Sequence, residues 1–415
     1  MCLDEVCCVE SAALRRFLTV VGFYDSVHRG KHLPKPRLPQ VEQVMSVSRL
    51  RVAFVTPGGT AGRGGMGRMA HYLTQELQRS NPAIQLRVYD SYGPGRALLM
   101  PFYFFKCFVT LAFLGIVRPP HVLHLNMAAH GSTFRKLLLM RVASALGVPA
   151  IVHIHASKFV PFCDSLSPGT RRLLVRSLSR ASQIVVIGNY WRHYVVDTLG
   201  VPAEIVTVLH NAVPLLPAPP PRANRRCRIV ALGLLGARKG TPDLLRALAT
   251  PALRELEWEA LIAGNGSVEE SRALARSLGI LERVEIPGWV DADTVARALA
   301  CADVFVLPSH NEGLPVAILE AMAAELPVVA TPVGAIAEVV VPDETGYLVP
   351  AGDSDALADA LARLVKNTEL RVRLGQNGRK RLEQNFRIEI AAERFMTLYR
   401  ELAQGDGAPI AGSSE

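Results

Sequence analysis

The chain has 415 residues, 49% hydrophobic and 20% charged, and this composition excludes wholesale disorder. Because single cores stop growing at roughly 250–300 residues, we expect two domains. Lys and Arg number 46 against 37 Asp and Glu, and the net charge of +9 favours anionic partners. The sequence has no Lys/Arg block with interleaved aromatic residues, so we expect phosphates or acidic lipid headgroups and no nucleic acid.

The N-terminal 1–49 segment shows no clear relation to the rest of the chain. It contains Cys2, Cys7 and Cys8 and a Pro-rich basic run, and we expect it to be a poorly ordered leader, with Met45 as an alternative start. No CxxC pair and no secretory signal peptide are recognisable, which predicts reduced thiols and a cytoplasmic protein.

After the leader, short apolar runs alternate with helical stretches, a pattern typical of βαβ units around a parallel sheet. A Pro-rich linker, 214–227, interrupts the alternation, which then restarts. The sequence therefore predicts an α/β fold of two Rossmann-like, doubly wound domains, 50–213 and 228–385, that face each other across a cleft. A final helix, 386–403, could cross back to the first domain, and 404–415 should be a disordered tail.

A glycine-rich loop follows the first strand of the N-terminal domain. Gly62, Gly64 and Gly67 satisfy the GxGxxG pattern and Asp90 ends the next strand, as in a dinucleotide-binding fingerprint. PGGTA separates the strand from these glycines, which weakens that interpretation. We expect instead that Gly64 and Gly65 let backbone N–H groups approach a phosphate or sugar at a helix N-terminus, with a flexible loop without a ligand as the alternative.

Residues 96–120 form an apolar run of about the ~20 residues that a bilayer span requires. Pro101 and Lys106 interrupt it, and a spanning helix would place Lys106 in hydrocarbon at a cost of ~2.5–3.5 kcal/mol. We therefore expect a helix that dips into the interface of an anionic membrane, with an ordinary buried helix and a true span as alternatives. The protein would then bind peripherally to the inner face of the cytoplasmic membrane.

Two further segments of the first domain carry polar candidates. HGSTFRK offers Ser132, Arg135 and Lys136, which could receive a phosphorylated lipid acceptor or form a solvated basic helix start. His155 follows a strand in HIHASK and is a candidate site residue, with a purely structural histidine as the alternative. We expect His153 to point to the opposite side of that strand and to lie outside the site.

In the second domain, Arg238 and Lys239 lie on a turn after the expected strand 228–235, above a helix with Thr241 as its expected N-cap. Two cations above a helix N-terminus can neutralise a diphosphate, although a solvated basic turn is the alternative. Gly264 ends the next strand, where either a nucleoside approach or a plain turn would explain it.

Glu312 and Glu320 lie eight positions apart across a Gly-Leu-Pro turn that opens a small-residue helix. Glu312 stands at the helix mouth and Glu320 deeper along it, which suits hydroxyl recognition on either side of a bound phosphate. Asp291 and Asp293 resemble a metal-binding DxD pair, but they open a helix, so we expect capping and no metal site.

EGLPVAILE resembles the E-x7-E motif of the family 4 glycosyltransferases, and the resemblance extends from about residue 50 to 403. GGMGR, ARKG, AGNG, PSHNEGLP and TPVGAIAEVV occur in family order, and HLNMAAHGSTFRK and HIHASKF resemble a subgroup acting in bacterial surface polysaccharide assembly. The resemblance implies the GT-B fold and a retaining, metal-independent enzyme without a cofactor. Its substrates would be a UDP- or GDP-sugar donor and a glycan or polyprenyl-linked acceptor.

The resemblance also assigns roles to residues. Glu312 would contact the transferred sugar and Glu320 the ribose, while Lys239 would bind the diphosphate and His155 would orient the sugar. Backbone N–H groups after Glu312 would meet sugar or phosphate, at Gly313, Leu314 and Val316.

The chain departs from the family pattern at three places. Leu234 replaces the usual Arg, so Arg238 is the expected substitute at the diphosphate; the other departures are NAVP at 211–214 and GAIAE at 334–338. Two other functions stay open at this point: a NAD-dependent oxidoreductase, and a catalytically silent GT-B protein that only binds partners.

Overall fold

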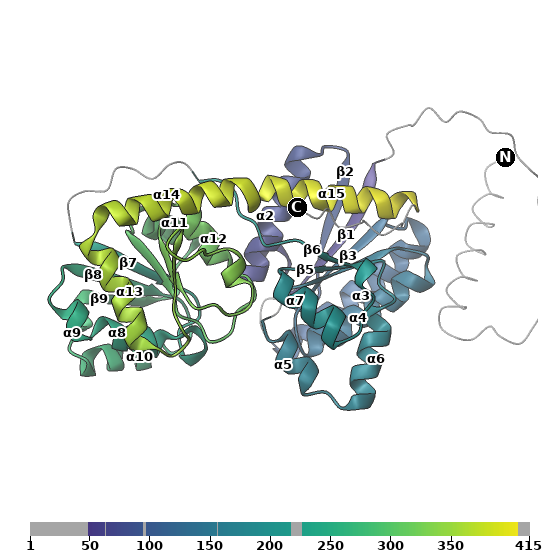
Figure 1. Ribbon diagram of the computed structural model, residues 1–415. Coiled ribbons are helices and arrows are strands. Elements are labelled where there is room, and N and C mark those ends of the chain that lie inside the picture. The colour runs from purple at the N-terminus through teal and green to yellow at the C-terminus, as the bar shows by residue number, and fades with distance from the viewer. Residues whose placement is uncertain (1–48, 63, 94–96, 156, 217–225, 406–415) are drawn as a thin grey trace, which may run out of the picture.

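The computed structural model describes residues 49–62, 64–93, 97–155, 157–216 and 226–405. The two parallel sheets predicted from the sequence are present in it, one in each domain (Figure 1). The leader, most of the linker and the end of the tail lie outside the described residues.

The N-terminal sheet has the order β2-β1-β3-β4-β5-β6 and is parallel throughout. Its apolar strands are buried on both faces, as expected where helices cover both sides of a parallel sheet. The strands are β1 (Leu50–Thr56), β2 (Ile84–Asp90), β3 (Val122–Met127), β4 (Ala150–Ile154), β5 (Gln183–Val186) and β6 (Val206–Val208). The helices are α2 (Gly65–Ser80), α3 (Met100–Val117), α4 (Gly131–Ala145), α5 (Phe159–Asp164), α6 (Pro168–Leu178) and α7 (Asn189–His193).

The C-terminal sheet repeats this design with the order β12-β11-β10-β7-β8-β9. Its strands are β7 (Cys227–Leu232), β8 (Trp258–Ala263), β9 (Val284–Gly288), β10 (Val304–Leu307), β11 (Val328–Ala330) and β12 (Gly346–Leu348). Its helices are α8 (Thr241–Leu248), α9 (Pro251–Arg254), α10 (Val268–Ser277), α11 (Ala292–Ala300), α12 (Val316–Ala323), α13 (Ser354–Lys366) and α14 (Thr368–Asn385).

The last helix, α15 (Ile388–Gln404), continues from α14 and crosses to the N-terminal domain (Figure 1). There it packs against α2, β1 and β3, and the Tyr399 hydroxyl lies 2.7 Å from Nδ1 of His124. The chain therefore joins the two domains twice, through the linker and through α14–α15.

Two local predictions in the second domain were wrong. The strand expected at 228–235 ends at Leu232, because the chain turns at Gly233 with φ 151°. The N-cap of α8 is Gly240 at φ 68°, and Thr241 is already helical, with its hydroxyl accepting from the Gly236 N–H at 3.0 Å.

Candidate active site

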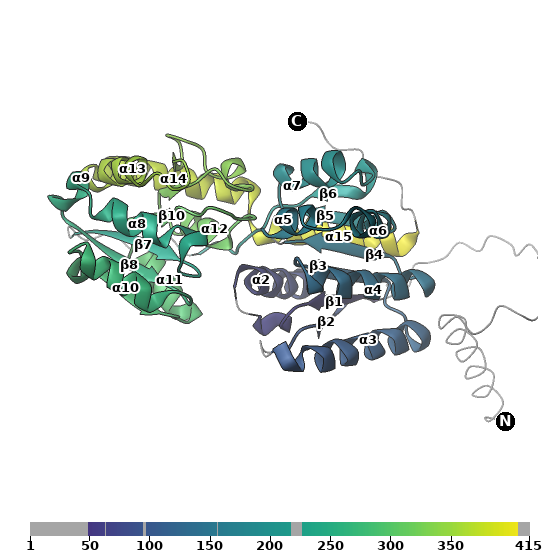
Figure 2. The same cartoon turned by 90° about the horizontal axis from the view of Figure 1, so that it is seen from below.

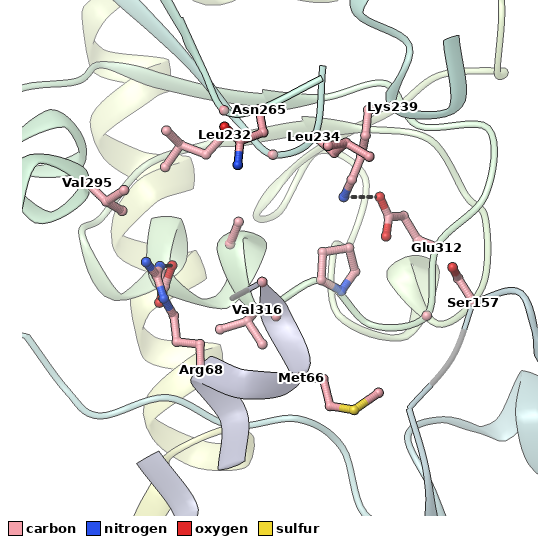
Figure 3. A pocket seen from close by; sticks show the side chains of 18 of the residues that line it. Met66, Arg68, Ser157, Leu232, Leu234, Lys239, Asn265, Val295, Glu312 and Val316 are labelled. Atoms are coloured by element: carbon pink, nitrogen blue, oxygen red, sulfur yellow. Dashed lines mark hydrogen bonds and ion pairs between the residues drawn. The ribbon is translucent and has the colours of Figure 1, made fainter. Parts of the chain in front are cut away.

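A cavity of about 510 Å³ lies between the two domains (Figure 3). Helices α2 and α12 both begin at it, so two helix N-termini with unsatisfied N–H groups face the same space. The cavity is lined by all the donor-side and catalytic candidates named from the sequence: Gly64, Gly65, His155, Arg238, Lys239, Gly264, Glu312, Gly313, Leu314, Val316 and Glu320.

Glu312 is held at the mouth of α12 by groups from its own domain. Its Oε1 accepts a hydrogen bond of 2.8 Å from the Ser309 hydroxyl and forms an ion pair with Lys239, and the Arg238 guanidinium lies 3.9 Å away. Arg238 also donates to the Asn311 carbonyl at 3.0 Å. A carboxylate and two cations are thus placed side by side, an arrangement that suits sugar hydroxyls next to a phosphate.

The loop after Glu312 is fixed by hydrogen bonds to its carbonyl groups. The Ala335 N–H donates to the Gly313 carbonyl at 3.0 Å, and the Asn211 side chain donates to the Leu314 carbonyl at 2.6 Å. Because the carbonyls are held, the N–H groups of Gly313, Leu314 and Val316 keep a fixed orientation at the start of α12.

Glu320 is buried and contacts the other domain. The Arg68 guanidinium donates to both of its oxygens, at 2.9 and 2.6 Å, and the Tyr72 hydroxyl donates to Oε1 at 2.9 Å. Burial raises the pKa of Glu320, and Arg68 and Tyr72 act in the opposite direction. The carboxylate that should hold a ribose is therefore bound by N-terminal-domain donors in this structure.

His155 faces the cavity as a neutral ring. Burial lowers its pKa to about 3, and both ring nitrogens, like Oδ1 of Asn211, are buried without a hydrogen-bond partner. Buried polar atoms of this kind can form hydrogen bonds with a polar group that enters the cavity. The expectation that His153 points to the opposite side of the strand was wrong, because residues two apart share one face: its ring centroid lies 3.8 Å from that of His155. As expected, His153 is not among the residues that line the cavity.

Gly264 has a structural reason to be glycine. Its φ is 153°, and a Cβ there would lie 1.6 Å from the Gly233 carbonyl oxygen. Close packing of two strand ends explains this residue without a nucleoside, although it lines the cavity together with Asn265 and Trp289.

The acceptor-side candidates lie elsewhere in the N-terminal domain and do not line the cavity. Lys136 is buried and donates to the Ser91 hydroxyl, and burial lowers its pKa to about 7. The Ser132 hydroxyl accepts from the Ala128 N–H at 3.2 Å, and Arg135 stacks over Tyr92 at 5.6 Å. A role for these residues in receiving an acceptor stays a prediction.

Asp90 bears on the dinucleotide interpretation. Its Oδ1 accepts from the N–H groups of Gly58, Tyr92 and Gly93 at 2.8, 2.8 and 2.9 Å. In a dinucleotide fold the equivalent carboxylate binds the ribose, whereas here it ties its own loop together. The geometry gives the oxidoreductase alternative no support.

No cluster of three or more His, Cys, Asp or Glu side chains that could hold a metal occurs within the described ranges. Asp291 caps α11 as predicted, accepting from the Thr294 N–H at 2.8 Å.

Sequence reasoning missed three residues that build the site: Arg68, Tyr72 and Asn211. Arg68 and Tyr72 lie four residues apart just after the glycine loop, and that spacing on one helix face was an available signal. Nothing in the local sequence indicated that they reach Glu320 in the other domain.

Comparison with known proteins gives two family matches. Residues 45–212 match the family described as Glycosyl transferase 4-like domain, and residues 217–381 match Glycosyl transferases group 1.

Two curated relatives are mycobacterial. Phosphatidyl-myo-inositol mannosyltransferase of Mycobacterium leprae is 34% identical over 236 residues, which cover 56% of this chain and 59% of that protein. GDP-mannose-dependent alpha-(1-6)-phosphatidylinositol monomannoside mannosyltransferase of Mycobacterium tuberculosis is 30% identical over 279 residues, 63% of this chain and 71% of that protein.

Among solved structures, HepE of Anabaena in complex with UDP and glucose has a TM-score of 0.66 at 18% identity, over 85% of this chain and 99% of that chain. Sucrose-phosphate synthase of Thermosynechococcus elongatus has a TM-score of 0.68 at 20% identity, over 86% and 100%. At these identities the likeness shows a common fold.

Proposed function

Because the chain belongs to the family 4 glycosyltransferases of GT-B fold, we propose that it transfers a sugar from a UDP- or GDP-sugar to a glycan or polyprenyl-linked acceptor in polysaccharide biosynthesis. The observation that carries the proposal is the interdomain cavity. Arg238, Lys239, two helix N-termini and two carboxylates line it together, which matches the charges and hydroxyls of a nucleoside diphosphate sugar.

The transfer breaks the bond between the sugar C1 and the diphosphate oxygen and forms a bond from C1 to an acceptor hydroxyl. Lys239, Arg238 and the α12 N-terminus would stabilise the charge on the departing diphosphate. Glu312 and neutral His155 would bind sugar hydroxyls, and the acceptor proton would pass to the leaving phosphate oxygen. With Glu312 used as a sugar ligand, attack on the same face predicts retention of the anomeric configuration.

We also infer that the reaction needs no metal ion. Lys239 and Arg238, with the helix dipole of α12, supply positive charge where the diphosphate would lie. Among the residues that the structure describes, Arg68, Arg238 and Lys239 are the basic side chains that line the cavity.

A membrane surface is the further partner that we propose, and α3 carries the argument. It is long and apolar enough to cross a membrane by length and composition, and only 17% of its residues are buried. The buried residues Cys107, Leu111 and Gly115 attach one narrow face to the domain, whereas large apolar side chains cover the opposite face. Those exposed side chains are Phe102, Phe105, Val109, Phe113 and Val117.

This distribution supports a helix lying in the membrane interface. A buried helix would not expose three phenylalanines to water, and a spanning helix would have to leave its contacts with α4 and β2. Figure 2 shows α3 at the outer rim of the N-terminal domain. Peripheral binding at the cytoplasmic face would bring the cleft close to a polyprenyl-linked acceptor.

Purified protein incubated with a panel of UDP- and GDP-sugars tests the function. We expect one donor to raise the melting temperature and to be hydrolysed slowly, with unchanged hydrolysis in EDTA and a released sugar of the donor's anomeric configuration by NMR. Binding without hydrolysis or transfer would favour the catalytically silent alternative. Loss of activity in EDTA, or an inverted product, would overturn the corresponding part of the proposal.

A further inference from the structure

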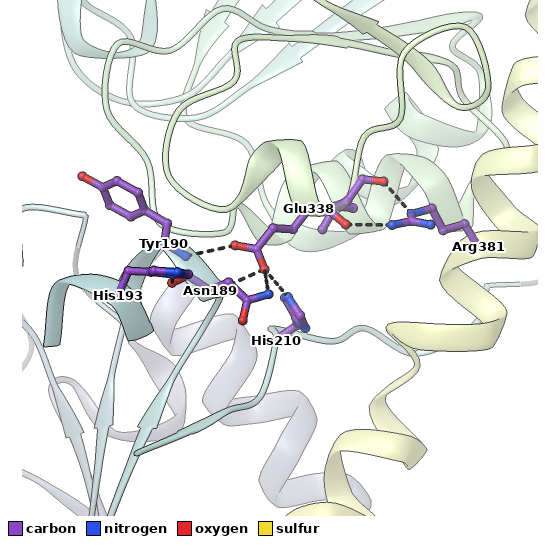
Figure 4. Close-up of polar contacts among 7 residues, drawn as sticks. Asn189, Tyr190, His193, His210, Glu338 and Arg381 are labelled. Atoms are coloured by element: carbon purple, nitrogen blue, oxygen red, sulfur yellow. Dashed lines mark hydrogen bonds and ion pairs between the residues drawn. The ribbon is translucent and has the colours of Figure 1, made fainter. Parts of the chain in front are cut away.

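The carboxylate of Glu338 connects the two domains (Figure 4). Glu338 ends the short helix η7 (Ile336–Glu338) of the C-terminal domain, yet the hydrogen-bonding partners of its carboxylate all belong to the N-terminal domain. The N–H groups of Asn189 and Tyr190 donate at 3.0 and 3.2 Å, the Asn189 side chain at 3.2 Å, and His210 Nε2 lies at 2.9 Å.

The contact is tight on the N-terminal side. A Cβ added at Gly188 would lie 2.4 Å from the Ala335 Cβ and 2.9 Å from Oε1 of Glu338. On the other side, the Arg381 guanidinium of α14 donates to the carbonyls of Glu338 and Val339 at 2.8 and 3.0 Å. Residues of both domains therefore contact the segment around Glu338 and hold it in place.

The same segment holds the loop that carries Glu312. The Ala335 N–H donates to the Gly313 carbonyl, and Gly334, at φ 61°, packs so closely that a Cβ would lie 2.3 Å from the Glu312 carbonyl oxygen. A short path of contacts thus leads from the N-terminal domain through Glu338 to the proposed sugar-binding residues.

Glu338 is charged in this setting. Burial acts to raise its pKa, but the hydrogen bonds from His210, Asn189 and Tyr190 outweigh burial and hold the pKa below its ordinary value. Hydrogen bonds to an ionised acceptor are roughly twice as strong as neutral ones.

We propose that Glu338 is a positioning residue that clasps the two domains and, through Gly334 and Ala335, holds Glu312 and Gly313 in place at the donor sugar. The proposal rests on the transferase function proposed above and adds a residue that does not touch the substrate. If the proposal is correct, removing the Glu338 side chain changes two places in the molecule. One is the 188–193 segment of the N-terminal domain, and the other is the loop that carries Glu312 and Gly313.

Hydrogen exchange in the full-length protein tests the clasp without any substrate. In Glu338→Ala, the amides of Asn189 and Tyr190 lose their acceptor, so exchange of a peptide covering 188–193 should rise at least about tenfold. Exchange unchanged in that peptide would overturn the proposal whatever the activity. Glu338→Gln keeps one acceptor oxygen without the charge, and its exchange should fall between the wild type and Glu338→Ala.

A comparison of kcat with nucleotide affinity then distinguishes a positioning role of Glu338 from a general disruption of the cavity. We expect Glu338→Ala to lower kcat about tenfold while the Kd for UDP or GDP changes less than about threefold, because Arg238 and Lys239 do not contact Glu338. Gly188→Ala pushes on the same contact from the N-terminal domain and should give the same split. Equal losses of nucleotide affinity and kcat would instead indicate damage to the whole cavity and contradict the positioning role.

Glu344→Ala, at an exposed glutamate of the same domain, is the matched control and should leave exchange and kinetics unchanged. The two proposals can fail separately. A wild type that binds and turns over no nucleotide sugar would sink the proposed function, and the exchange result on 188–193 would still decide the clasp.

Discussion

Glu320 is the residue where sequence and structure must be combined. The resemblance of its motif implies that Glu320 binds a ribose, but the structure shows its oxygens accepting from Arg68 and Tyr72. A carboxylate offers about four lone-pair sites, so one site remains for a ribose hydroxyl, or Arg68 must give way.

We predict that Glu320→Gln weakens the binding of the donor nucleotide by about 10- to 100-fold, because charge-assisted hydrogen bonds to the ribose are lost. Calorimetric titration with UDP and GDP measures this. Arg68→Met is the control: it breaks the same interdomain ion pair and leaves the carboxylate in place. If both variants lose affinity equally, the loss belongs to the ion pair and the ribose contact is wrong; if Glu320→Gln binds normally, the contact does not exist.

Individual residues could be predicted from the sequence where a short motif carries them. Glu312, Lys239 and Gly313 belong to contiguous motifs and all line the cavity. Arg68 and Asn211 could not be placed in this way, because their partners, Glu320 and the Leu314 carbonyl, are 252 and 103 residues away in the chain. Contacts of that separation depend on how the domains pack, which no local pattern encodes.

At the scale of elements, α3 was predicted as a helix from its apolar run, but its orientation was not. Apolar residues fill nearly every position of α3, so the sequence showed no polar face to mark the solvent side. The structure shows which face is buried: only the face with Cys107, Leu111 and Gly115 packs against the domain, and the opposite face is exposed.

We predict that changing Phe102, Phe105 and Phe113 together to Ser reduces binding to vesicles containing anionic phospholipid by at least about tenfold, since each buried aromatic side chain contributes about 1.5–3 kcal/mol. All three side chains are exposed, so the fold should be kept and the melting temperature unchanged. Co-sedimentation with vesicles measures binding.

Val372→Ser, at an exposed apolar position on α14, is the matched control. Undiminished sedimentation of the triple variant would remove α3 from the proposed membrane surface. Equal binding of the wild type to purely zwitterionic vesicles would show that the basic charge of the protein plays no part.

At the scale of the whole molecule, the two-domain architecture was predictable because βαβ alternation repeats on both sides of one Pro-rich break. The packing of the last helix, α15, was less predictable from the sequence. The interior partner of α15 is the N-terminal domain, and its Tyr399 joins a buried polar cluster with His124. No periodicity in α15 distinguishes packing on one domain from packing on the other.

That cluster makes a prediction for acid stability. His124, His153 and His155 are buried, and burial lowers the pKa of His124 and His155 to about 3 from an ordinary 6.5. Below the ordinary value the unfolded chain binds protons that the folded chain excludes. The free energy of unfolding therefore falls as pH falls from 6.5 toward 3, by about 1.4 kcal/mol per pH unit for each such histidine.

Urea unfolding between about pH 5 and pH 6.5 measures this slope in a window where carboxylates with lowered pKa values, such as Glu338, contribute little. Glu320, whose pKa is raised, acts with the opposite sign, so a difference between variants is the sharper quantity. His124→Asn should reduce the slope by about 1 kcal/mol per pH unit, because the unfolded histidine is only half protonated at the upper end of this window. Tyr399→Phe removes the same hydrogen bond without a group that titrates in this range, so it should lower stability and keep the wild-type slope. Equal slopes for His124→Asn and the wild type would mean that His124 takes up its proton in the folded protein, and that the crossing of α15 does not seal the histidines from water.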